Sequence, residues 1–257
     1  MIVLAYVASL VAGLAAGVGV NVLADRIEDE ETATGRGNHC QKCGATLPTT
    51  RLVPVVGFGA ESRACAQCGR LASLRAPVLS ATLGLVYLLL LVHIDQSAGQ
   101  LRLPVLSVFL IEALSATVLA FVFAVDLEHR LILDSAVYPA VAALLLLAGI
   151  FEHKAFAAML IGVIIYGGLF LILYGLGYLL YRTEALGLGD VKLAILIGLM
   201  VGWPGILQAV ILGGLFGAGI SLLLLGMGVA SRHTYIPYGI FMATGALLAL
   251  LLTPPYW

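Results

Sequence analysis

Long apolar stretches constrain the fold of this chain most. A helix needs about 20 consecutive apolar residues to cross the hydrocarbon core of a bilayer. Eight runs approach that length, near residues 1–24, 76–94, 104–125, 135–151, 155–181, 189–202, 205–229 and 237–252. The chain is 61% hydrophobic and only 11% charged, whereas soluble domains are near half apolar and a quarter charged. Because a helix satisfies its own backbone in lipid, we expect an all-α integral membrane protein with about eight transmembrane helices.

The same pattern predicts three regions. A first transmembrane helix occupies 1–24, a polar loop of about 50 residues occupies 25–75, and seven further helices form a membrane domain over 76–257. The first run lacks a basic start, so we interpret it as a spanning helix and not as a cleaved signal peptide. The net charge of −1 argues against a nucleic-acid partner; the lipid bilayer is the expected surrounding.

Lysine and arginine residues predict the orientation in the membrane. Seven of them lie in the loop 25–75, and four more lie in or beside the third, fifth and seventh loops. Only Arg102 and Lys154 fall on the other side. By the positive-inside rule, both termini should lie outside and the first loop should be cytoplasmic.

All four cysteines lie in that first loop, as two Cys-x-x-Cys pairs: Cys40 with Cys43, and Cys65 with Cys68. A glycine follows each pair and lets the chain turn, so that four sulfur atoms can face one ion. Two disulfides are the alternative, but thiols stay reduced in the cytoplasm. An iron–sulfur cluster and His39 as a rival ligand are weaker interpretations. We predict a structural zinc site that folds the loop.

Two carboxylates stand where apolar runs meet polar sequence. Asp126 follows the run that ends at Val125, and Asp190 lies at the start of another run. A carboxylate beside or within a bilayer is costly and usually functional, and the charge pattern places both at the cytoplasmic ends of their helices. Close carboxylates can share a proton and act as acid and base on a water-attacked peptide bond. Acidic residues at helix ends are also often mere boundary markers, so Asp126 and Asp190 are candidates for such a catalytic pair.

Other residues around these aspartates have open roles. Gly187 and Gly189 would let backbone approach a substrate or a facing helix closely. Lys192 either helps to hold the charge of Asp190 or only extends to the interface. Asp134 fits the start of the next helix, where aspartate is a favoured cap. Glu112, in the middle of its run, either lines the site or hydrogen-bonds a neighbouring helix.

Several motifs resemble those of one family. The segment 187–193, Gly-Leu-Gly-Asp-Val-Lys-Leu, matches the Gly-x-Gly-Asp-x-Lys-Leu signature of the type IV prepilin peptidases, which are intramembrane aspartyl proteases. The segment 126–134 has the shape of the family's first aspartate loop, with Leu133 where proline is common. The segments 235–239 and 17–21 resemble its Ile-Pro-Phe-Gly-Pro and Gly-Ser-Phe-x-Asn runs, and the two cysteine pairs match as well.

The resemblance implies a prepilin-type aspartic endopeptidase in the bacterial cytoplasmic (inner) membrane. It would remove the basic leader of type IV prepilins, or of type II secretion pseudopilins, on the cytoplasmic side, with Asp126 and Asp190 as catalytic residues. Many members also methylate the new N-terminus with S-adenosylmethionine, an activity associated with the zinc-bearing first loop.

The first loop departs from the pattern of the bifunctional members. The segment 52–54 keeps only the proline of an Asn-Ile-Pro run, the segment 61–64 keeps an arginine at best, and the segment 75–80 loses a glutamate. We therefore assign no residue to methylation. Two other hypotheses stay open: a transporter that uses Asp126 and Asp190 as a proton or cation relay, and a zinc-folded assembly factor without catalysis.

Overall fold

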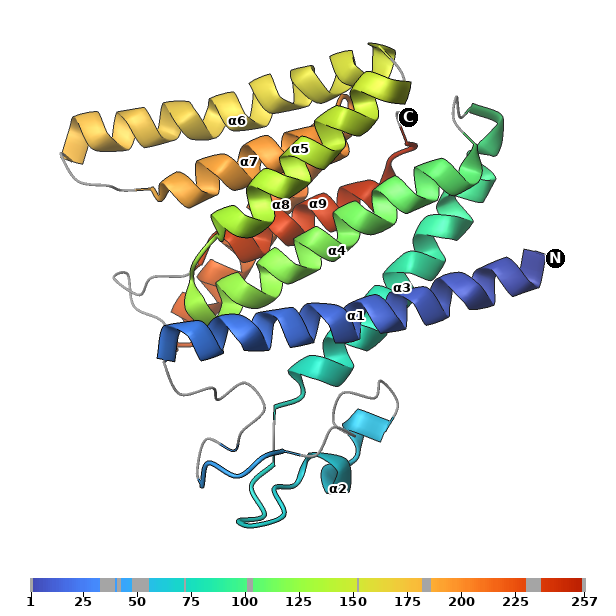
Figure 1. Ribbon diagram of the computed structural model, residues 1–257. Coiled ribbons are helices and arrows are strands. Elements are labelled where there is room, and N and C mark those ends of the chain that lie inside the picture. The colour runs from blue at the N-terminus through green and yellow to red at the C-terminus, as the bar shows by residue number, and fades with distance from the viewer. Residues whose placement is uncertain are drawn as a thin grey trace. The chain divides into compact units, whose positions relative to one another are not determined.

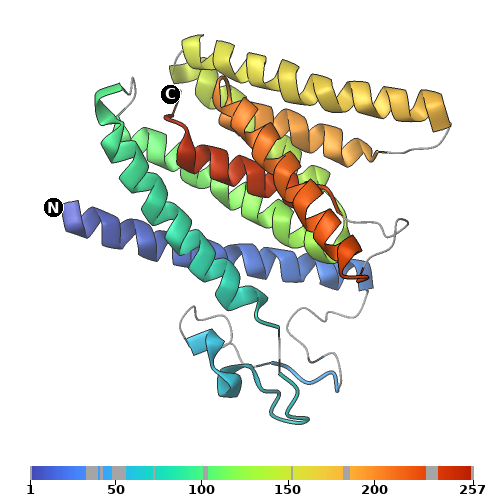
Figure 2. The same ribbon diagram turned by 180° about the vertical axis from the view of Figure 1, so that it is seen from behind.

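Helices make up nearly all of the structure (Figures 1 and 2). The computed structural model describes residues 2–32, 40, 43–47, 56–71, 73–100, 104–151, 153–181, 186–229 and 237–255. The long helices are α1 (Ile2–Thr32), α3 (Arg75–Gln96), α4 (Val105–His129), α5 (Asp134–Phe151), α6 (His153–Tyr181), α7 (Leu188–Val201), α8 (Gly205–Gly226) and α9 (Gly239–Leu252). The short ones are η2 (Val56–Phe58), α2 (Ala60–Arg63) and η3 (Ala98–Gln100). The predicted all-α fold with eight main helices is confirmed.

Five of the described helices are long and apolar enough to cross a membrane: α1 over Val3–Asp25, α3, α4, α6 over Phe156–Leu180, and α8. Shorter apolar helices occur at Asp134–Leu147 in α5 and at α9, and α7 has 14 residues. Apolar side chains on the long helices are widely exposed, as at Ile164, Leu179 and Leu222, which are 71%, 73% and 68% exposed. Apolar exposure on this scale marks a surface that meets lipid.

The chain divides into two compact units, residues 1–92 and 93–257. In the first unit, α1 and α3 cross at two glycines of α1. A Cβ atom on Gly13 would lie 2.4 Å from the Leu83 carbonyl oxygen, and one on Gly17 would lie 2.4 Å from Ser80 Cα. No side chain fits in such a gap, so glycine permits the close approach of the two backbones.

A polar cluster joins the same two helices where the loop 25–75 leaves and returns. The Arg75 side chain donates through Nε to Asn21 Oδ1 (2.9 Å) and forms an ion pair with Asp25. The Asn21 amide also donates to Asp25 (3.3 Å). Gly17 and Asn21, one turn apart on α1, therefore both face α3, and this contact explains the pairing of glycine and asparagine in the segment 17–21.

The second unit is built around α7. Side chains of α7 are almost fully buried from Leu193 to Val201, and α7 contacts α5, α6, α8 and α9. Gly162 of α6 and Gly198 of α7 press together so closely that a Cβ atom on Gly162 would lie 2.3 Å from the Gly198 carbonyl oxygen. Figures 1 and 2 both show α6 and α7 side by side. The helix that begins with the Gly-x-Gly-Asp segment is thus the most enclosed element of its unit.

Candidate active site and metal centre

Asp126 lies one turn before the end of α4 and is buried. Its Oδ2 accepts a hydrogen bond of 3.0 Å from the backbone N–H of Ile240, in the first turn of α9. The first N–H groups of a helix have no partner within the helix, and they favour a negative group beside them. The start of α9 therefore holds one oxygen of Asp126 in a fixed place.

Gly239, the first residue of α9, makes that contact sterically possible. A Cβ atom at this position would lie 2.7 Å from Asp126 Oδ2 and 3.1 Å from Asp126 Cγ. Real Cβ atoms do not approach an oxygen so closely. Any other residue would push the carboxylate or the helix away, so glycine is required for the observed geometry.

Asp190 lies in the first turn of α7 and is also buried. Gly187, in extended conformation, caps this helix, and its carbonyl oxygen accepts the N–H of Asp190 at 3.1 Å. Gly189 packs against the loop after α4, where a Cβ atom on the glycine would lie 3.2 Å from Ile132 Cβ. Gly189 thus lets the start of α7 approach the connection after α4 closely.

The structure brings the two aspartates into one site. The charge of Asp126 acts on Asp190, and Asp190 in turn acts on Tyr166 of α6 and on Tyr238, the residue before α9. Phe170 contacts both tyrosine rings, at centroid distances of 5.1 and 5.8 Å. The two carboxylates are therefore near enough to interact electrostatically, and a group of aromatic side chains from α6 and the start of α9 lies within reach of the charge of Asp190.

Lys192 does not pair with Asp190 in the structure. Its Nζ donates to both carboxylate oxygens of Asp134, at 2.7 and 2.9 Å, and lies 5.4 Å from the ring centroid of Tyr138. Asp134 begins α5, as predicted from its sequence position. The lysine therefore links α7 to α5 beside the acidic pair.

Glu112 is buried in the middle of α4, and its Oε2 has no hydrogen-bond partner among the described residues. It precedes Asp126 by 14 residues of the same helix, which corresponds to about 21 Å along the axis. At that separation Glu112 belongs to a different part of the unit from the aspartate pair.

The four cysteines form two turns of the same design in the first unit. In the first turn, the Gly44 N–H donates to the Cys40 carbonyl (2.8 Å) and the Cys40 N–H to the Ala45 carbonyl (2.7 Å). The turn at Cys65 repeats both bonds with Gly69 and Arg70, each at 2.9 Å. Gly44 and Gly69 both have positive φ, 72° and 68°, which glycine adopts without steric cost.

The sulfur atoms of these turns lie within 4.8 Å of one another, and none of the four cysteines forms a disulfide. Two sulfur pairs across the turns, Cys40 with Cys68 and Cys43 with Cys65, are 3.5 Å apart. Sulfur atoms around a tetrahedral zinc ion, each about 2.3 Å from the metal, are about 3.8 Å from one another. The cluster can therefore hold a metal ion of the size and ligand preference of zinc. His39 lies outside the described residues.

The surroundings of the thiols affect their acidity in opposite directions. Backbone N–H groups of Cys68 and Gln67 lower the pKa of Cys65. The backbone bond with Ala45 lowers the pKa of Cys43, but desolvation and the other sulfur atoms outweigh it and raise this pKa to about 12. Four thiolates at this spacing repel one another, so the set is suited to a divalent ion that neutralises them.

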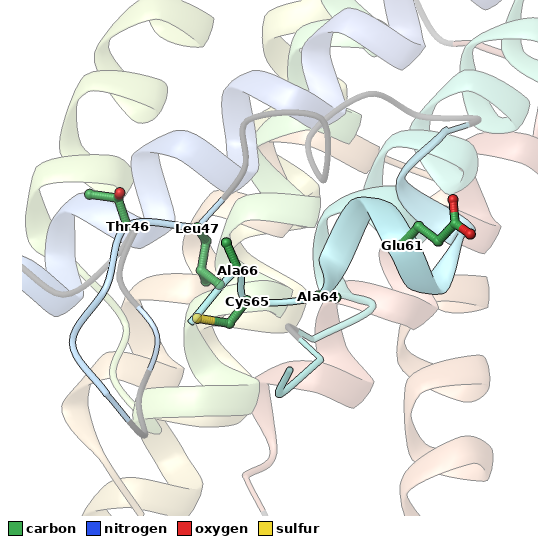
Figure 3. Close-up of a pocket in the computed structure, with 6 residues that line it drawn as sticks. All are labelled: Thr46, Leu47, Glu61, Ala64, Cys65 and Ala66. Atoms are coloured by element: carbon green, nitrogen blue, oxygen red, sulfur yellow. The ribbon is translucent and has the colours of Figure 1, made fainter. Parts of the chain in front are cut away.

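A hollow of about 620 Å³ opens beside the cysteine cluster (Figure 3). Its lining comes from Thr46, Leu47, Glu61, Ala64, Cys65 and Ala66. Leu47 and Cys65 belong to a small apolar core with Cys40, and Figure 3 shows Glu61 on α2, at a distance from them. Of the four cysteines, Cys65 therefore lines this hollow, together with one acidic side chain.

Two family models match the chain. The model of the type IV leader peptidase family matches residues 113–222, and that of the bacterial peptidase A24 N-terminal domain matches residues 11–94. Over these two segments the chain is similar to the type IV leader peptidase family. The first match includes both aspartates of the acidic pair, and the second includes all four cysteines.

Curated relatives agree with this similarity. A protein named prepilin leader peptidase/N-methyltransferase from Myxococcus xanthus is 27% identical over 87% of this chain and 64% of its own length. Proteins of the same name from Burkholderia pseudomallei and Legionella pneumophila are 29% and 26% identical, over 85% and 82% of this chain and 68% and 70% of their own. The chain thus spans about two thirds of the length of these relatives. No solved structure matches it.

Two parts of the site could not be predicted from the sequence. The contact of Gly239 with Asp126 joins two helices that are far apart in the chain, so the segment 235–239 gave no indication of it. The partner of Lys192 was not predicted either. For Gly239, the available signal was a glycine directly at the start of an apolar run.

Proposed function

We propose that this chain is a membrane-embedded aspartyl endopeptidase that removes the basic leader of type IV prepilins or type II secretion pseudopilins. The observation that carries the proposal is the meeting of two buried aspartates, Asp126 and Asp190, from α4 and α7. A pair of carboxylates that shares one proton can hydrolyse a peptide bond without a covalent intermediate, as in the aspartic proteases. The names of the relatives supply the substrate class.

In the proposed reaction the ionised aspartate accepts a proton from a water molecule as its oxygen attacks the peptide carbonyl carbon. The protonated aspartate donates its proton to the carbonyl oxygen, which gives a tetrahedral intermediate. The C–N bond then breaks, the leaving nitrogen takes up the proton held by the first aspartate, and the second regains its proton from the hydroxyl. The Ile240 N–H would keep Asp126 aligned throughout.

We place this site at the cytoplasmic face of a bacterial inner membrane, with both termini outside. The distribution of lysine and arginine supports this orientation, since Arg130 and Lys192 lie close in sequence to the two aspartates. A prepilin would then present its basic leader to the enzyme on the side where it is synthesised. Reporter fusions after Leu252 and within the loop 25–75 would test this orientation. The first fusion should report the outside of the membrane and the second the cytoplasm.

We further propose that the cysteine cluster binds one structural zinc ion. The spacing of the sulfur atoms and the repeated turns fit the tetrahedral four-cysteine geometry of structural zinc sites. All four ligands come from the protein, which is typical of a closed structural site. The ion would stabilise the fold of the loop 25–75, which is too small to build a large apolar core alone.

N-methylation of the new N-terminus is a second proposed activity, because the relatives carry N-methyltransferase in their names. S-adenosylmethionine would supply the methyl group. The hollow beside the cysteine cluster has the volume of a small-molecule site, and the Glu61 carboxylate can accept hydrogen bonds from ribose hydroxyls. Mass spectrometry of the mature pilin N-terminus tests this activity, since methylation adds one methyl group and its absence would restrict the enzyme to cleavage.

Co-expression with a prepilin that retains its leader tests the peptidase proposal. Wild type should release the leader, and Asp126→Asn and Asp190→Asn should each reduce cleavage by at least about 100-fold, the contribution expected of an acid or base. Asp95→Asn, an exposed aspartate of α3, serves as the control and should cleave normally. Full cleavage by both site variants would rule out the aspartyl mechanism.

A further inference from the structure

The chain that leaves the first aspartate takes a short and fixed route. The Arg130 N–H donates to the Asp126 carbonyl (3.0 Å), and Arg130 ends α4 in a left-handed conformation with φ 57° and ψ 34°. Residues 131–133 then connect to α5, which begins at Asp134. Since so few residues separate the two helices, the position of Asp134 is tied closely to that of Asp126.

This connection contacts α7 on both sides of the second aspartate. Ile132 packs on Gly189, the residue before Asp190. Asp134 receives two hydrogen bonds from Lys192, two residues after Asp190, at 2.7 and 2.9 Å. One segment of five residues, 130–134, therefore contacts the start of α7 at two places, Gly189 and Lys192.

Lys192 is held by α5 through a second contact. Its Nζ lies 5.4 Å from the ring centroid of Tyr138, one turn after Asp134 in the same helix, and a cation over an aromatic ring is attracted to it. Side chains of Lys192 and Asp134 are 32% and 54% exposed. The pair is thus an accessible ion pair at the edge of the site, and it does not touch the Asp190 carboxylate.

We propose that Asp134 and Lys192 are positioning residues that set the separation of the two catalytic carboxylates. The inference rests on the proposed peptidase function. The pair joins the first turn of α7, which carries Asp190, to the connection that follows Asp126, so that its loss would let the two helix ends move apart. An exposed ion pair contributes little to the stability of a fold, and variants of this pair should therefore still fold.

Kinetics with purified enzyme and a prepilin substrate test the proposal. Lys192→Met and Asp134→Asn should each lower kcat about tenfold with KM nearly unchanged, since small displacements of catalytic groups are costly. The double variant Asp134→Lys with Lys192→Asp should recover most of the wild-type kcat. Single variants with normal kcat, a change in KM alone, or a double variant as slow as the single ones would overturn the proposal.

A distance measurement keeps this test separate from the peptidase proposal. Spin-labelled non-natural residues at Leu127 and Leu188, both exposed neighbours of the site, report the separation of the helix ends by pulsed electron paramagnetic resonance. The distribution of distances between the two labels should be narrow in wild type and broad in Lys192→Met. It should be narrow again in the double variant Asp134→Lys with Lys192→Asp. Equal distributions in all three would overturn the positioning role. A wild-type enzyme that cleaves no prepilin would instead contradict the proposed function.

Discussion

At the scale of single residues, the arrangement around Asp126 depends on the absence of a side chain. The Ile240 N–H reaches the carboxylate at 3.0 Å only because Gly239 leaves room for the Asp126 oxygen beside the start of α9. The hydrogen bond fixes the carboxylate, and the glycine makes the bond possible. Together they place the end of α4 against the first turn of α9.

Gly239→Ala should therefore impair cleavage while leaving the protein folded. The added Cβ would lie 2.7 Å from Asp126 Oδ2 and displace the carboxylate, and a misplacement of about 1 Å can cost about 100-fold in rate. Leader cleavage by the purified variant measures the effect. The matched control is Gly219→Ala in α8, where a Cβ would meet nothing within 4 Å; equal rates for the two variants would contradict the account.

The two aspartates were predictable from the sequence, because a charge at the edge of an apolar run is visible in one dimension. Their supporting contacts were not. Ile240 is 114 residues from Asp126, and Lys192 is 58 residues from Asp134, so neither pairing leaves a local pattern. The sequence suggested Asp190, its neighbour along the helix, as one partner of Lys192, whereas the hydrogen bonds of Lys192 go to another helix.

At the scale of helices, glycines determine how closely α6 and α7 pack. Gly162 and Gly198 face each other with backbone in contact, as small residues do in membrane helix pairs. Lipid offers no hydrophobic drive between helices, so close van der Waals packing stabilises the pair. Because α7 carries Asp190 at its start, this contact also supports the site.

Gly162→Ala should destabilise the protein by about 1–3 kcal/mol, as overpacking does. The new Cβ would lie 2.3 Å from the Gly198 carbonyl oxygen, so the two helices must separate. Thermal unfolding in detergent measures the loss. Gly168→Ala in the same helix, where a Cβ meets nothing within 4 Å, should unfold like wild type; an unchanged transition for both would show that the contact has no energetic role.

Apolar run lengths predicted the eight main helices, with ends displaced by a few residues. The largest difference is in α1, which continues to Thr32, eight residues past the expected end, because acidic and other polar residues also extend a helix once it has begun. Which helix would be central was not predictable: α7, the shortest and most doubtful run, is the most buried. The length of an apolar run measures apolar content, and it carries no information on which other helices will pack around that run.

At the scale of the whole molecule, the chain combines two units of different chemistry. One unit contains a cysteine cluster suited to zinc, and the other contains the acidic pair. The cysteine spacing was sufficient to predict that four sulfur atoms meet, because each Cys-x-x-Cys turn is a local structure. Nothing in the acidic pair needs the metal, so removal of zinc should affect first the unit that binds it.

Cys65→Ser should abolish stoichiometric zinc binding and expose the loop region to protease. Cys65 is buried at the centre of the small core with Cys40 and Leu47, and structural zinc sites contribute directly to folding. Elemental analysis of the purified protein and limited proteolysis measure both effects. Ala66→Ser, its exposed neighbour, should keep one zinc ion per chain, and a Cys65→Ser protein with full zinc content would contradict the assignment.

Purified protein reconstituted into liposomes, with leader cleavage and ion flux measured in the same preparation, tests the central claim most directly. Wild type should cleave a prepilin, while Asp126→Asn and Asp190→Asn should not, and no preparation should carry a flux that depends on the two acids. Normal cleavage by either variant would contradict the account, as would a proton or cation flux that only the wild type supports.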